Sequence, residues 1–307
     1  MKEYDALVLG GGPAGLTAAL YLARSEVSLA LVEKLSPGGQ TLMTHMIENY
    51  PGFPEGVEGW RLADLFARHL DKYDLARYGD EVSAVETGEG LHKVKVGQEW
   101  LAAKTLIVCS GAQYRRLGLP GEKELLGRGV SYCALCDGNF FKGQDIAVIG
   151  GGNSALEESL YLAKLVNKIH LIHRRDVFRG QKCIQNKCEI NPKIVFHRSS
   201  VVKRIAGDKA VEGVLVENLT TKEETRLDVS GVFIFAGTEP QGDFLPKELE
   251  KDSAGFLVTD LEMRTNIKGV FAAGDIRSKA CRQVATAVGD GATAATAAHA
   301  YLETLHA

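Results

Sequence analysis

The sequence predicts an α/β fold that is built on parallel sheets and contains two copies of one strand–turn–helix unit. The stretches "YDALVLGGGPAGLTAALYLA" and "QDIAVIGGGNSALEESLYLA" each give an acidic residue, a short apolar strand, a glycine turn and an amphipathic helix. They lie about half the chain apart. Elsewhere, strand-length apolar segments alternate with helical segments, as in proteins with parallel sheets.

The composition is that of a globular protein without a basic surface for polyanions. The chain has 307 residues, of which 45% are hydrophobic and 24% charged, and its formal net charge is −3. It contains no block of lysines and arginines, so we expect no nucleic-acid partner and no binding to an anionic membrane. The uncharged run from Ala6 to Ala23 is interrupted by four glycines and a proline. A buried strand followed by a helix explains this run better than a membrane span does.

Two segments rich in glycine and proline indicate where the chain passes between domains. They span residues 111–122 and 237–246, lie near the ends of apolar strands, and bracket the second unit. The second domain is therefore predicted to be inserted into the first. The predicted ranges are 1–113 and 244–307 for the first domain and 114–243 for the second.

The glycine turn of the first unit has the spacing of a dinucleotide-binding turn. Gly10, Gly12 and Gly15 follow a strand at G-x-G-x-x-G spacing and open a helix. Such glycines allow a tight turn, close approach to a pyrophosphate and close helix–strand packing, while the helix amino terminus offers N–H donors to the anion. The next strand ends at Glu33, an acid that favours a ribose with free hydroxyls, as in FAD or NAD.

The second unit differs from the first at the position that selects the nucleotide. Gly150, Gly152 and Ala155 form the G-x-G-x-x-A variant of the turn. The first unit has its acid 23 positions after the first glycine, and at the same distance the second unit has His173. Three arginines with planar, permanently charged groups follow it: Arg174, Arg175 and Arg179. This site is predicted to prefer NADPH, although a tight turn or a solvated basic helix start would explain either pattern alone.

A third segment is expected to complete the first nucleotide site. Residues 265–276 form an apolar strand that ends in Gly274 and Asp275, and Asp275 would contact the ribityl–pyrophosphate part of a flavin. Arg282, Gln283 and Val284 then open an alanine-rich helix, whose positive amino terminus would face the flavin N1–C2=O edge and favour the reduced anion. A surface turn with a helix cap is the alternative for Asp275.

Cys133 and Cys136 admit three interpretations. A zinc site needs four ligands, and the other close pair, Cys183 and Cys188, has no histidine at ligand spacing, so no metal is expected. A permanent staple would close only a tiny loop. A redox pair fits a chain with two sites for electron carriers. Asp137 could protonate the released thiolate, or could simply form the turn before glycine.

Cysteine usage also bears on the compartment. The chain has six cysteines at irregular spacings, which does not resemble the disulfide framework of a small secreted protein. A reducing cytoplasm is therefore the expected location.

The motifs together resemble the low-molecular-weight thioredoxin reductases of the pyridine nucleotide-disulfide oxidoreductase family. Besides the two glycine turns, the matching stretches are "GGQ" at 38–40, "ENYPGF" at 48–53, "CALCDG", "HRRDVFR", "GVFAAGDI" and "RQV". They occur in the family's order along essentially the whole chain.

The resemblance implies a homodimeric enzyme with two Rossmann-like domains of three-layer ββα form, the NADPH domain being inserted into the FAD domain. NADPH would reduce the flavin, the flavin would reduce the disulfide, and a rotation between domains would expose the dithiol to thioredoxin. Cys136 would be the flavin-side thiol, Cys133 the thiol that attacks thioredoxin, and Asp137 the acid. The implied FAD-binding residues are Gly10, Gly12, Pro13, Ala14, Gly15, Glu33, Gly39, Gln40, Asn49, Gly111, Asp275, Arg282, Gln283 and Val284. The implied NADPH-binding residues are Gly150, Gly152, Asn153, Ser154, Ala155, His173, Arg174, Arg175 and Arg179.

Some positions depart from the family pattern, and they affect mainly the identity of the partner protein. Leu135 stands where Thr is usual, and Asn139 stands where many members have an aromatic residue that touches thioredoxin. The contacts with thioredoxin would then be made by Arg128, Phe140 and Phe141. The alternatives are a flavin-dependent dithiol oxidase, a reductase of another thioredoxin-like or peroxide-reducing partner, and a non-catalytic redox sensor.

Overall fold

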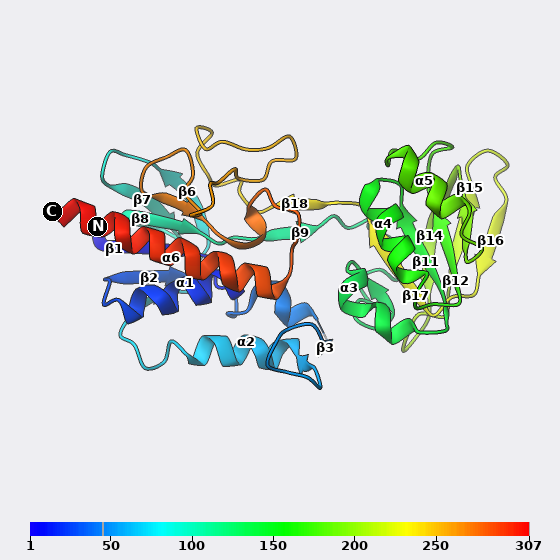
Figure 1. Cartoon of the computed structure of the whole chain (residues 1–307), viewed down its shortest axis with the longest axis horizontal. Helices are drawn as coiled ribbons and strands as arrows, with labels where there is room; N and C mark the ends of the chain where they lie inside the picture. The colour runs from blue at the N-terminus through cyan, green and yellow to red at the C-terminus, as the bar shows by residue number, and fades with distance from the viewer. Residues whose placement is uncertain (45, 307) are drawn as a thin grey trace. The chain divides into compact units, whose positions relative to one another are not determined.

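The structure, a computed structural model, describes residues 1–44 and 46–306. Its contacts divide the chain into two compact units: one joins Met1–Gln113 to Glu239–Ala307, and the other is Tyr114–Thr238. Both chain ends therefore belong to the first unit, and the middle of the chain forms the second (Figure 1). The predicted return to the first domain at residue 244 falls a few residues after the change of unit at 239.

The first unit is built on a seven-stranded mixed sheet. Its strand order is β5-β2-β1-β8-β7-β6, with β19 also pairing to β8. β1, β2, β5, β8 and β19 run parallel, whereas β6, β7 and β8 form an antiparallel meander. The strands are β1 (Lys2–Leu9), β2 (Leu29–Val32), β5 (Ala76–Tyr78), β6 (Val82–Glu86), β7 (His92–Val96), β8 (Glu99–Val108) and β19 (Val270–Ala272).

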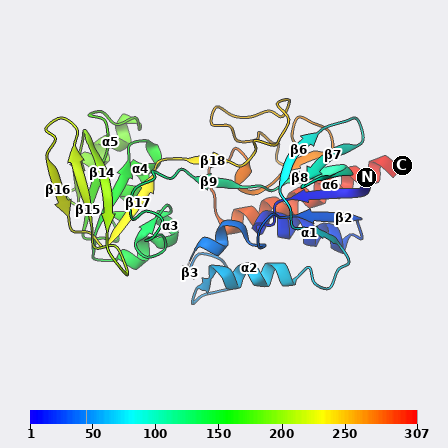
Figure 2. The same cartoon turned by 180° about the vertical axis from the view of Figure 1, so that it is seen from behind.

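Helices α1 (Pro13–Arg24) and α6 (Val284–His306) pack against each other on one face of this sheet (Figures 1 and 2). The alternating side-chain directions of β1 explain the layers, because Ala6 and Val8 face the two helices while Leu7 and Leu9 enter a second core with the meander. The strand and helix predicted for Ala6–Ala23 are thus confirmed as β1 and α1. Smaller elements of the unit are η1 (Gly39–Met43), β3 (Met46–Ile47), β4 (Val57–Glu58), α2 (Gly59–Arg68) and η3 (Gly274–Ile276).

The second unit repeats this plan. A parallel sheet of order β10-β17-β11-β12-β13 has a core on each face, and the antiparallel sheet β14-β15-β16 contributes to one of them. Its elements are β10 (Val130–Ser131), α3 (Ala134–Asp137), η2 (Gly138–Phe141), β11 (Asp145–Gly150), α4 (Asn153–Leu162), β12 (Lys168–Ile172), α5 (Lys182–Glu189), β13 (Ile194–His197), β14 (Ser200–Ala206), β15 (Gly213–Asn218), β16 (Glu224–Leu227) and β17 (Gly231–Phe235). The predicted α/β class with parallel sheets is confirmed.

The two segments that cross between the units pair with each other. β9 (Ala112–Tyr114) and β18 (Thr238–Pro240) form a two-stranded sheet. Backbone hydrogen bonds flank it, from the Gln241 N–H to the Gly111 carbonyl and from the Arg115 N–H to the Gly237 carbonyl, each 2.9 Å long. The glycine- and proline-rich segments of the sequence therefore serve as the crossings. Within residues 1–44 and 46–306, no helix has both the length and the apolar character that a membrane crossing needs.

His92 predicts a pH dependence of stability. Its side chain is fully buried on β7, and neither ring nitrogen has a well-formed hydrogen bond. Burial lowers its pKa, and the backbone of Lys268 opposes this shift only in part. An unfolded histidine titrates near pKa ~6.5, so protons bind preferentially to the unfolded chain below that pH and stability falls with the pH.

The substitution His92→Leu tests this. We expect a gain of about 1 kcal/mol at neutral pH, because an unsatisfied buried polar group is removed. We also expect a smaller loss of stability than in the wild type when the pH is lowered from about 7.5 to about 5.5, measured as urea unfolding midpoints. Exposed His69 provides the control, since His69→Gln should leave the pH dependence unchanged. An unchanged pH dependence in the His92 variant would contradict the prediction.

Candidate functional site

The first glycine turn connects β1 to α1 and leaves space beside the helix start. Gly10 has φ +113°, and a side chain there would collide with the carbonyl of Cys109. A side chain at Gly15 would strike the carbonyl of Gly10. At Gly12, by contrast, an added Cβ would have only the Cα of Gly39 near it, at 4.0 Å. The turn is thus closed on its inner side and open at Gly12, beside the free N–H groups of α1, as a bound pyrophosphate requires.

Glu33 lies directly under this turn. Its Oε2 accepts a hydrogen bond of 2.7 Å from the N–H of Gly11, and its Oε1 accepts one of 2.9 Å from the N–H of Leu35. A Cβ on Gly11 would come within 2.8 Å of the Glu33 side chain. The carboxylate is therefore held in a fixed position at the carboxyl end of β2, and each oxygen has a further lone pair to accept a hydroxyl.

Segments distant in sequence meet around the first turn. The Nδ2 of Asn49 donates to the Oε1 of Gln283 at 2.9 Å, although 234 positions separate them. Gln40 donates through Nε2 to the carbonyl of Ala112, beside Gly111, which has φ +72° and open space around its Cα. Two predicted FAD-binding residues, Asn49 and Gln283, are thus bonded to each other, and a third, Gln40, is bonded to the residue that follows Gly111.

The third segment also reaches the turn. Ala14, in the first turn of α1, lies 2.8 Å from the position of a Cβ on Gly274, so Asp275 is adjacent to the start of that helix. Arg282 donates to the carbonyls of Lys279 and Arg277, at 3.1 Å each. Its guanidinium also lies 4.0 Å from the ring centre of Phe256, so it fixes the loop in front of α6. The predicted Pro13 and Val284 are the first residues of α1 and α6.

The second glycine turn resembles the first, but Ala155 replaces the last glycine and Gly150 lacks the positive φ of Gly10. A Cβ on Gly150 would lie 2.6 Å from the Cβ of Ala155 and 2.8 Å from the carbonyl oxygen of Phe235. Ala155 is fully buried, and Gly152 faces open space. The Oδ1 of Asn153 accepts a 2.7 Å hydrogen bond from the N–H of Gln181, which ties the helix start to the basic loop. Ser154, also in the first turn of α4, is exposed.

His173 lies under Gly151 as Glu33 lies under Gly11. A Cβ on Gly151 would collide with the His173 ring, which is 6% exposed and stacks on Phe178 at 4.9 Å. Burial lowers the pKa of His173, and the neighbouring arginines lower it further. The Nε2 atom is buried without a hydrogen-bond partner. A neutral ring thus supports this turn where a carboxylate supports the other.

Three exposed arginines surround that ring: Arg174, Arg175 and Arg179. The N–H of Arg179 donates to the carbonyl of Gly151 at 2.8 Å, which holds the basic loop against the turn. Within residues 1–44 and 46–306, none of the three guanidinium groups is paired with a carboxylate. The cluster therefore fits an anion such as a 2′-phosphate.

Cys133 and Cys136 form a disulfide at the start of α3, with their Cα atoms 5.3 Å apart. The N–H of Cys136 points at the Sγ of Cys133, 3.2 Å away. Ser131 is a residue of this site that the sequence analysis missed. Its hydroxyl accepts from the N–H of Cys133 at 3.0 Å and donates to Oδ2 of Asp137 at 2.6 Å. The predicted acid is therefore anchored beside the disulfide, and Ser131 itself is buried.

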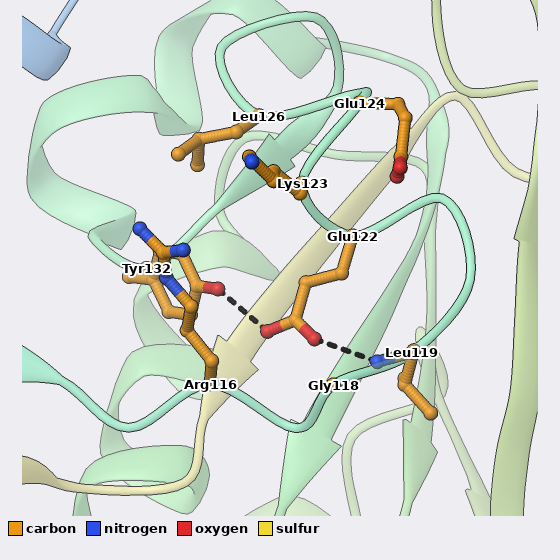
Figure 3. Close-up of a pocket in the computed structure, with 8 residues that line it drawn as sticks. All are labelled: Arg116, Gly118, Leu119, Glu122, Lys123, Glu124, Leu126 and Tyr132. Atoms are coloured by element: carbon orange, nitrogen blue, oxygen red, sulfur yellow. Dashed lines mark hydrogen bonds between the residues drawn. The ribbon is translucent and has the colours of Figure 1, made fainter.

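A second support lies on the chain just before the disulfide. Tyr132 donates to Oε1 of Glu122 at 2.6 Å and stacks on Tyr114 at 5.2 Å. Glu122 also accepts from the N–H groups of Leu117 and Leu119, next to a pocket of about 260 Å³ (Figure 3). Burial would raise the pKa of Glu122, but its hydrogen bonds lower it overall. An ionised, buried carboxylate thus fixes the residue before Cys133.

The residues expected to contact a partner separate into surface and core. Phe140 is 45% exposed, and Arg128 is exposed and donates to the carbonyl of Glu124. Phe141 is only 9% exposed and packs edge-to-face on Phe233 at 5.3 Å. Because its ring fills the core beside Gly231, we withdraw Phe141 from the expected partner surface.

Comparison with known proteins places this arrangement in a family. The family model described as pyridine nucleotide-disulphide oxidoreductase matches residues 4–291. The thioredoxin reductase of Treponema pallidum (strain Nichols) is 40% identical over 303 residues, covering 99% of this chain and 98% of the relative. That of Bacillus subtilis (strain 168) is 42% identical over 310 residues, covering 99% and 96%. The crystal structure of the thioredoxin reductase from Streptococcus pyogenes MGAS5005 has a TM-score of 0.94 and 45% identity, covering 98% and 99%. With two glycine turns, a disulfide beside an anchored carboxylate and relatives matched from end to end, the chain belongs to the pyridine nucleotide-disulphide oxidoreductase family, within its low-molecular-weight thioredoxin reductases.

Proposed function

We propose that this protein is an NADPH-dependent flavoenzyme that reduces the disulfide of thioredoxin through FAD and the pair Cys133–Cys136. The observation that carries the proposal is the disulfide itself, which lies at the start of a four-residue helix beside an anchored carboxylate. The names of the matched relatives support thioredoxin as the substrate. The same unit holds a nucleotide turn beside three arginines that have no carboxylate partner in the described part of the chain, which suits NADPH as the electron donor.

We assign FAD to the turn of the first unit. The open space at Gly12, the fixed carboxylate of Glu33 and the amino end of α1 fit a dinucleotide with free ribose hydroxyls. The residues implied by the resemblance line this turn or lie on the segments that meet there, and Asn49 and Gln283 are bonded to each other. When bound, FAD supplies a carrier that accepts a hydride and passes two electrons to a disulfide.

We assign NADPH to the turn of the second unit. Gly152 leaves room for the pyrophosphate, and Asn153 and Ser154 lie in the first turn of α4. Arg174, Arg175 and Arg179 would hold the 2′-phosphate, while His173 supports the turn from below. A guanidinium presents two parallel donors to a phosphate, and this geometry selects NADPH over NADH.

The dithiol would carry the electrons to the partner in two exchanges. The Cys133 thiolate attacks one sulfur of the thioredoxin disulfide, which forms a mixed disulfide and releases the other thioredoxin sulfur as a thiolate. The Cys136 thiolate then attacks the Cys133 Sγ, so the enzyme disulfide re-forms and both thioredoxin sulfurs are released reduced. Asp137 is placed to give a proton to a departing thiolate, because its carboxyl group is fixed by Ser131.

The partner surface, assembly and location complete the proposal. The exposed Phe140 offers an apolar contact and the exposed Arg128 a charged one, so thioredoxin would bind the second unit through these residues. A homodimer follows from the family resemblance, and a cytoplasmic location agrees with the sparse, irregular use of cysteine.

A direct assay tests the function. Beyond the NADPH that reduces its own flavin and disulfide, the FAD-loaded protein should consume NADPH continuously only when oxidised thioredoxin of its own organism is present, with one dithiol formed per NADPH consumed. If instead the protein produces hydrogen peroxide from small dithiols without a nicotinamide, it is a dithiol oxidase and the proposal is wrong. If it transfers no electrons to any disulfide, a sensor role replaces the enzymatic one.

The substitution Ser131→Ala should slow the dithiol step. Loss of the 2.6 Å bond would free the Asp137 carboxyl group, and the Cys133 N–H would lose its acceptor. We expect thioredoxin turnover to fall about 10-fold, and about 100-fold in Asp137→Asn, since positioned acids contribute on this order. Flavin reduction by NADPH should keep its rate in stopped-flow measurements. Ser230→Ala, at an exposed position of the same unit, is the control; equal turnover in both serine variants would contradict a positioning role for Ser131.

A further inference from the structure

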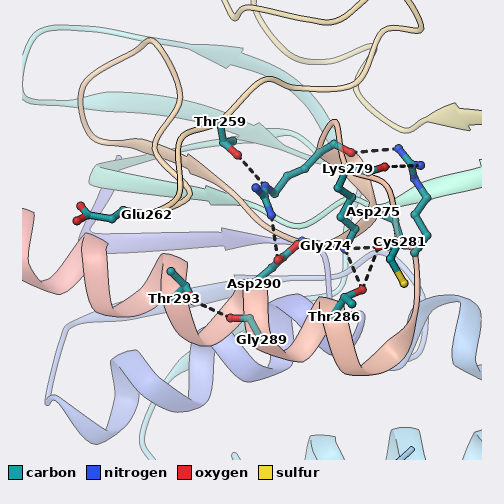
Figure 4. A network of polar contacts seen from close by, with 12 residues as sticks. Thr259, Glu262, Gly274, Asp275, Lys279, Cys281, Thr286, Gly289, Asp290 and Thr293 are labelled. Atoms are coloured by element: carbon teal, nitrogen blue, oxygen red, sulfur yellow. Dashed lines mark hydrogen bonds and ion pairs between the residues drawn. The ribbon is translucent and has the colours of Figure 1, made fainter. Parts of the chain in front are cut away.

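A cluster of four largely buried charges lies beside the first turns of α6, and apart from Asp275 its members have no role in the reaction proposed above (Figure 4). The side chain of Lys279 is 10% exposed, that of Arg277 12% and that of Asp290 13%. Asp275 completes the cluster, and its side chain is 27% exposed. Burial of charged groups is costly unless they are paired, so each contact in this cluster has an energetic consequence.

Lys279 joins the two acids. Its Nζ lies 3.0 Å from Oδ2 of Asp290 and 3.3 Å from Oδ1 of Asp275, and it donates to the hydroxyl of Thr286 at 3.3 Å. Asp290 has further partners, because its Oδ1 pairs with Arg277 at 2.9 Å and its Oδ2 accepts from the N–H of Gly274 at 3.1 Å. Asp275 Oδ1 has the Lys279 ion pair but no well-aligned hydrogen bond. Asp275 therefore depends on Lys279 more than Asp290 does.

The cluster is adjacent to the first glycine turn. Gly274 lies against the Cβ of Ala14, and a Cβ on Gly291, in α6, would collide with the carbonyl of Ala14. α1 carries no charged side chain before Arg24 at its far end, so this helix offers no cation to Asp275. The charged groups that face Asp275 are Lys279, Arg282 and Asp290. Burial raises the pKa of Asp275, and the negative charge of Asp290 raises it further. Lys279 is the main group that lowers this pKa, and Arg282 also lowers it.

We propose that Lys279 is a positioning residue of the FAD site: its ammonium group neutralises the buried Asp275 carboxylate and ties it to α6 through Asp290, so that the anionic cofactor binds without uptake of a proton. This inference rests on the proposed assignment of FAD to the first unit. Without Lys279, Arg282 would be the one remaining cation among the groups that act on Asp275, and the carboxylate would face the pyrophosphate without its ion-pair partner. FAD binding would then be coupled to protonation of Asp275.

The test measures FAD release from diluted holoenzyme by flavin fluorescence. The wild type should show a nearly constant FAD dissociation constant between about pH 6 and about pH 8.5. Lys279→Met should bind FAD about 10-fold more weakly at the upper pH and should approach the wild-type value at the lower pH, as Asp275 takes up a proton. The double variant Asp275→Asn/Lys279→Met should lose this pH dependence, because the titrating group is absent.

Two further variants separate charge from packing. Lys268→Met removes an exposed lysine from the same unit and should behave as the wild type. Lys279→Arg keeps the charge, so its FAD dissociation constant should stay independent of pH. If Lys279→Met does not fold, Lys279→Arg tests the proposal alone, because a pH-dependent dissociation constant in this variant would overturn it. An unchanged dissociation constant in Lys279→Met, or an equal loss at every pH, would also overturn it. A wild-type protein that binds no FAD would instead show that the proposed function is wrong.

Discussion

Replacement of Cys136 by serine is expected to halve the electron capacity of the FAD-loaded protein. With the disulfide intact, NADPH should deliver about four electrons, two to the flavin and two to the dithiol, because each centre is a two-electron couple. Cys136→Ser cannot form the disulfide with Cys133, so only about two electrons should be accepted. Anaerobic titration, followed by the bleaching of the flavin absorbance, counts both values, and thioredoxin reduction should be abolished in the variant.

The exposed Cys183 supplies the matched control for this experiment. It lies in α5 of the same unit and takes part in no disulfide, so Cys183→Ser should keep the wild-type capacity. Parallel titration with NADH tests the donor, and NADPH should reduce the flavin at much lower concentrations. Equal capacity in the wild type and Cys136→Ser would remove the pair from the electron path.

The sequence was sufficient for the parts of the site that depend on local geometry. A turn in which Gly10 must have positive φ, and in which Gly15 must pass its own chain closely, needs glycine at those positions. The same glycine spacing recurs near Gly150, although Gly150 itself has no positive φ, and it predicted two similar units, which the sheets confirm. The exchange of Gly15 for Ala155 is explained by the second turn, where Gly150 leaves room for the Ala155 Cβ.

The sequence was insufficient where function depends on contacts between side chains. Ser131 is within the stretch "SYCALCDG", but nothing in its spacing shows that its hydroxyl reaches Asp137 six positions later. The pairing of Lys279 with Asp290 depends on how a loop packs on α6. Phe140 and Phe141 are identical in type, and only the turn of η2 decides that the second enters the core. Short motifs thus specify backbone turns more reliably than they specify the neighbours of a side chain.

The arginines beside the second glycine turn predict the second large effect, which is a change in the preference for NADPH over NADH. The double substitution Arg174→Ala/Arg175→Ala should raise the KM for NADPH by at least about 100-fold, because two charge-assisted hydrogen bonds of roughly 1.5 kcal/mol or more each are lost. The KM for NADH should change little, since NADH has no 2′-phosphate for these groups to bind. Both side chains are exposed and lack carboxylate partners in the described part of the chain, so their removal should not unfold the unit. Steady-state kinetics with both nucleotides measure the change in preference.

Arg226→Ala separates a specific contact from a general loss of positive charge. Arg226 is exposed on β16 of the same unit and pairs with Asp228 at 2.9 Å, so its removal changes the net charge without touching the basic loop. This variant should keep the wild-type preference for NADPH. If the double variant lost NADPH and NADH affinity equally, the arginines would support the turn rather than bind the 2′-phosphate. His173, which lies under Gly151, would then share that supporting role, and the selectivity of the site would have to come from elsewhere in the second unit.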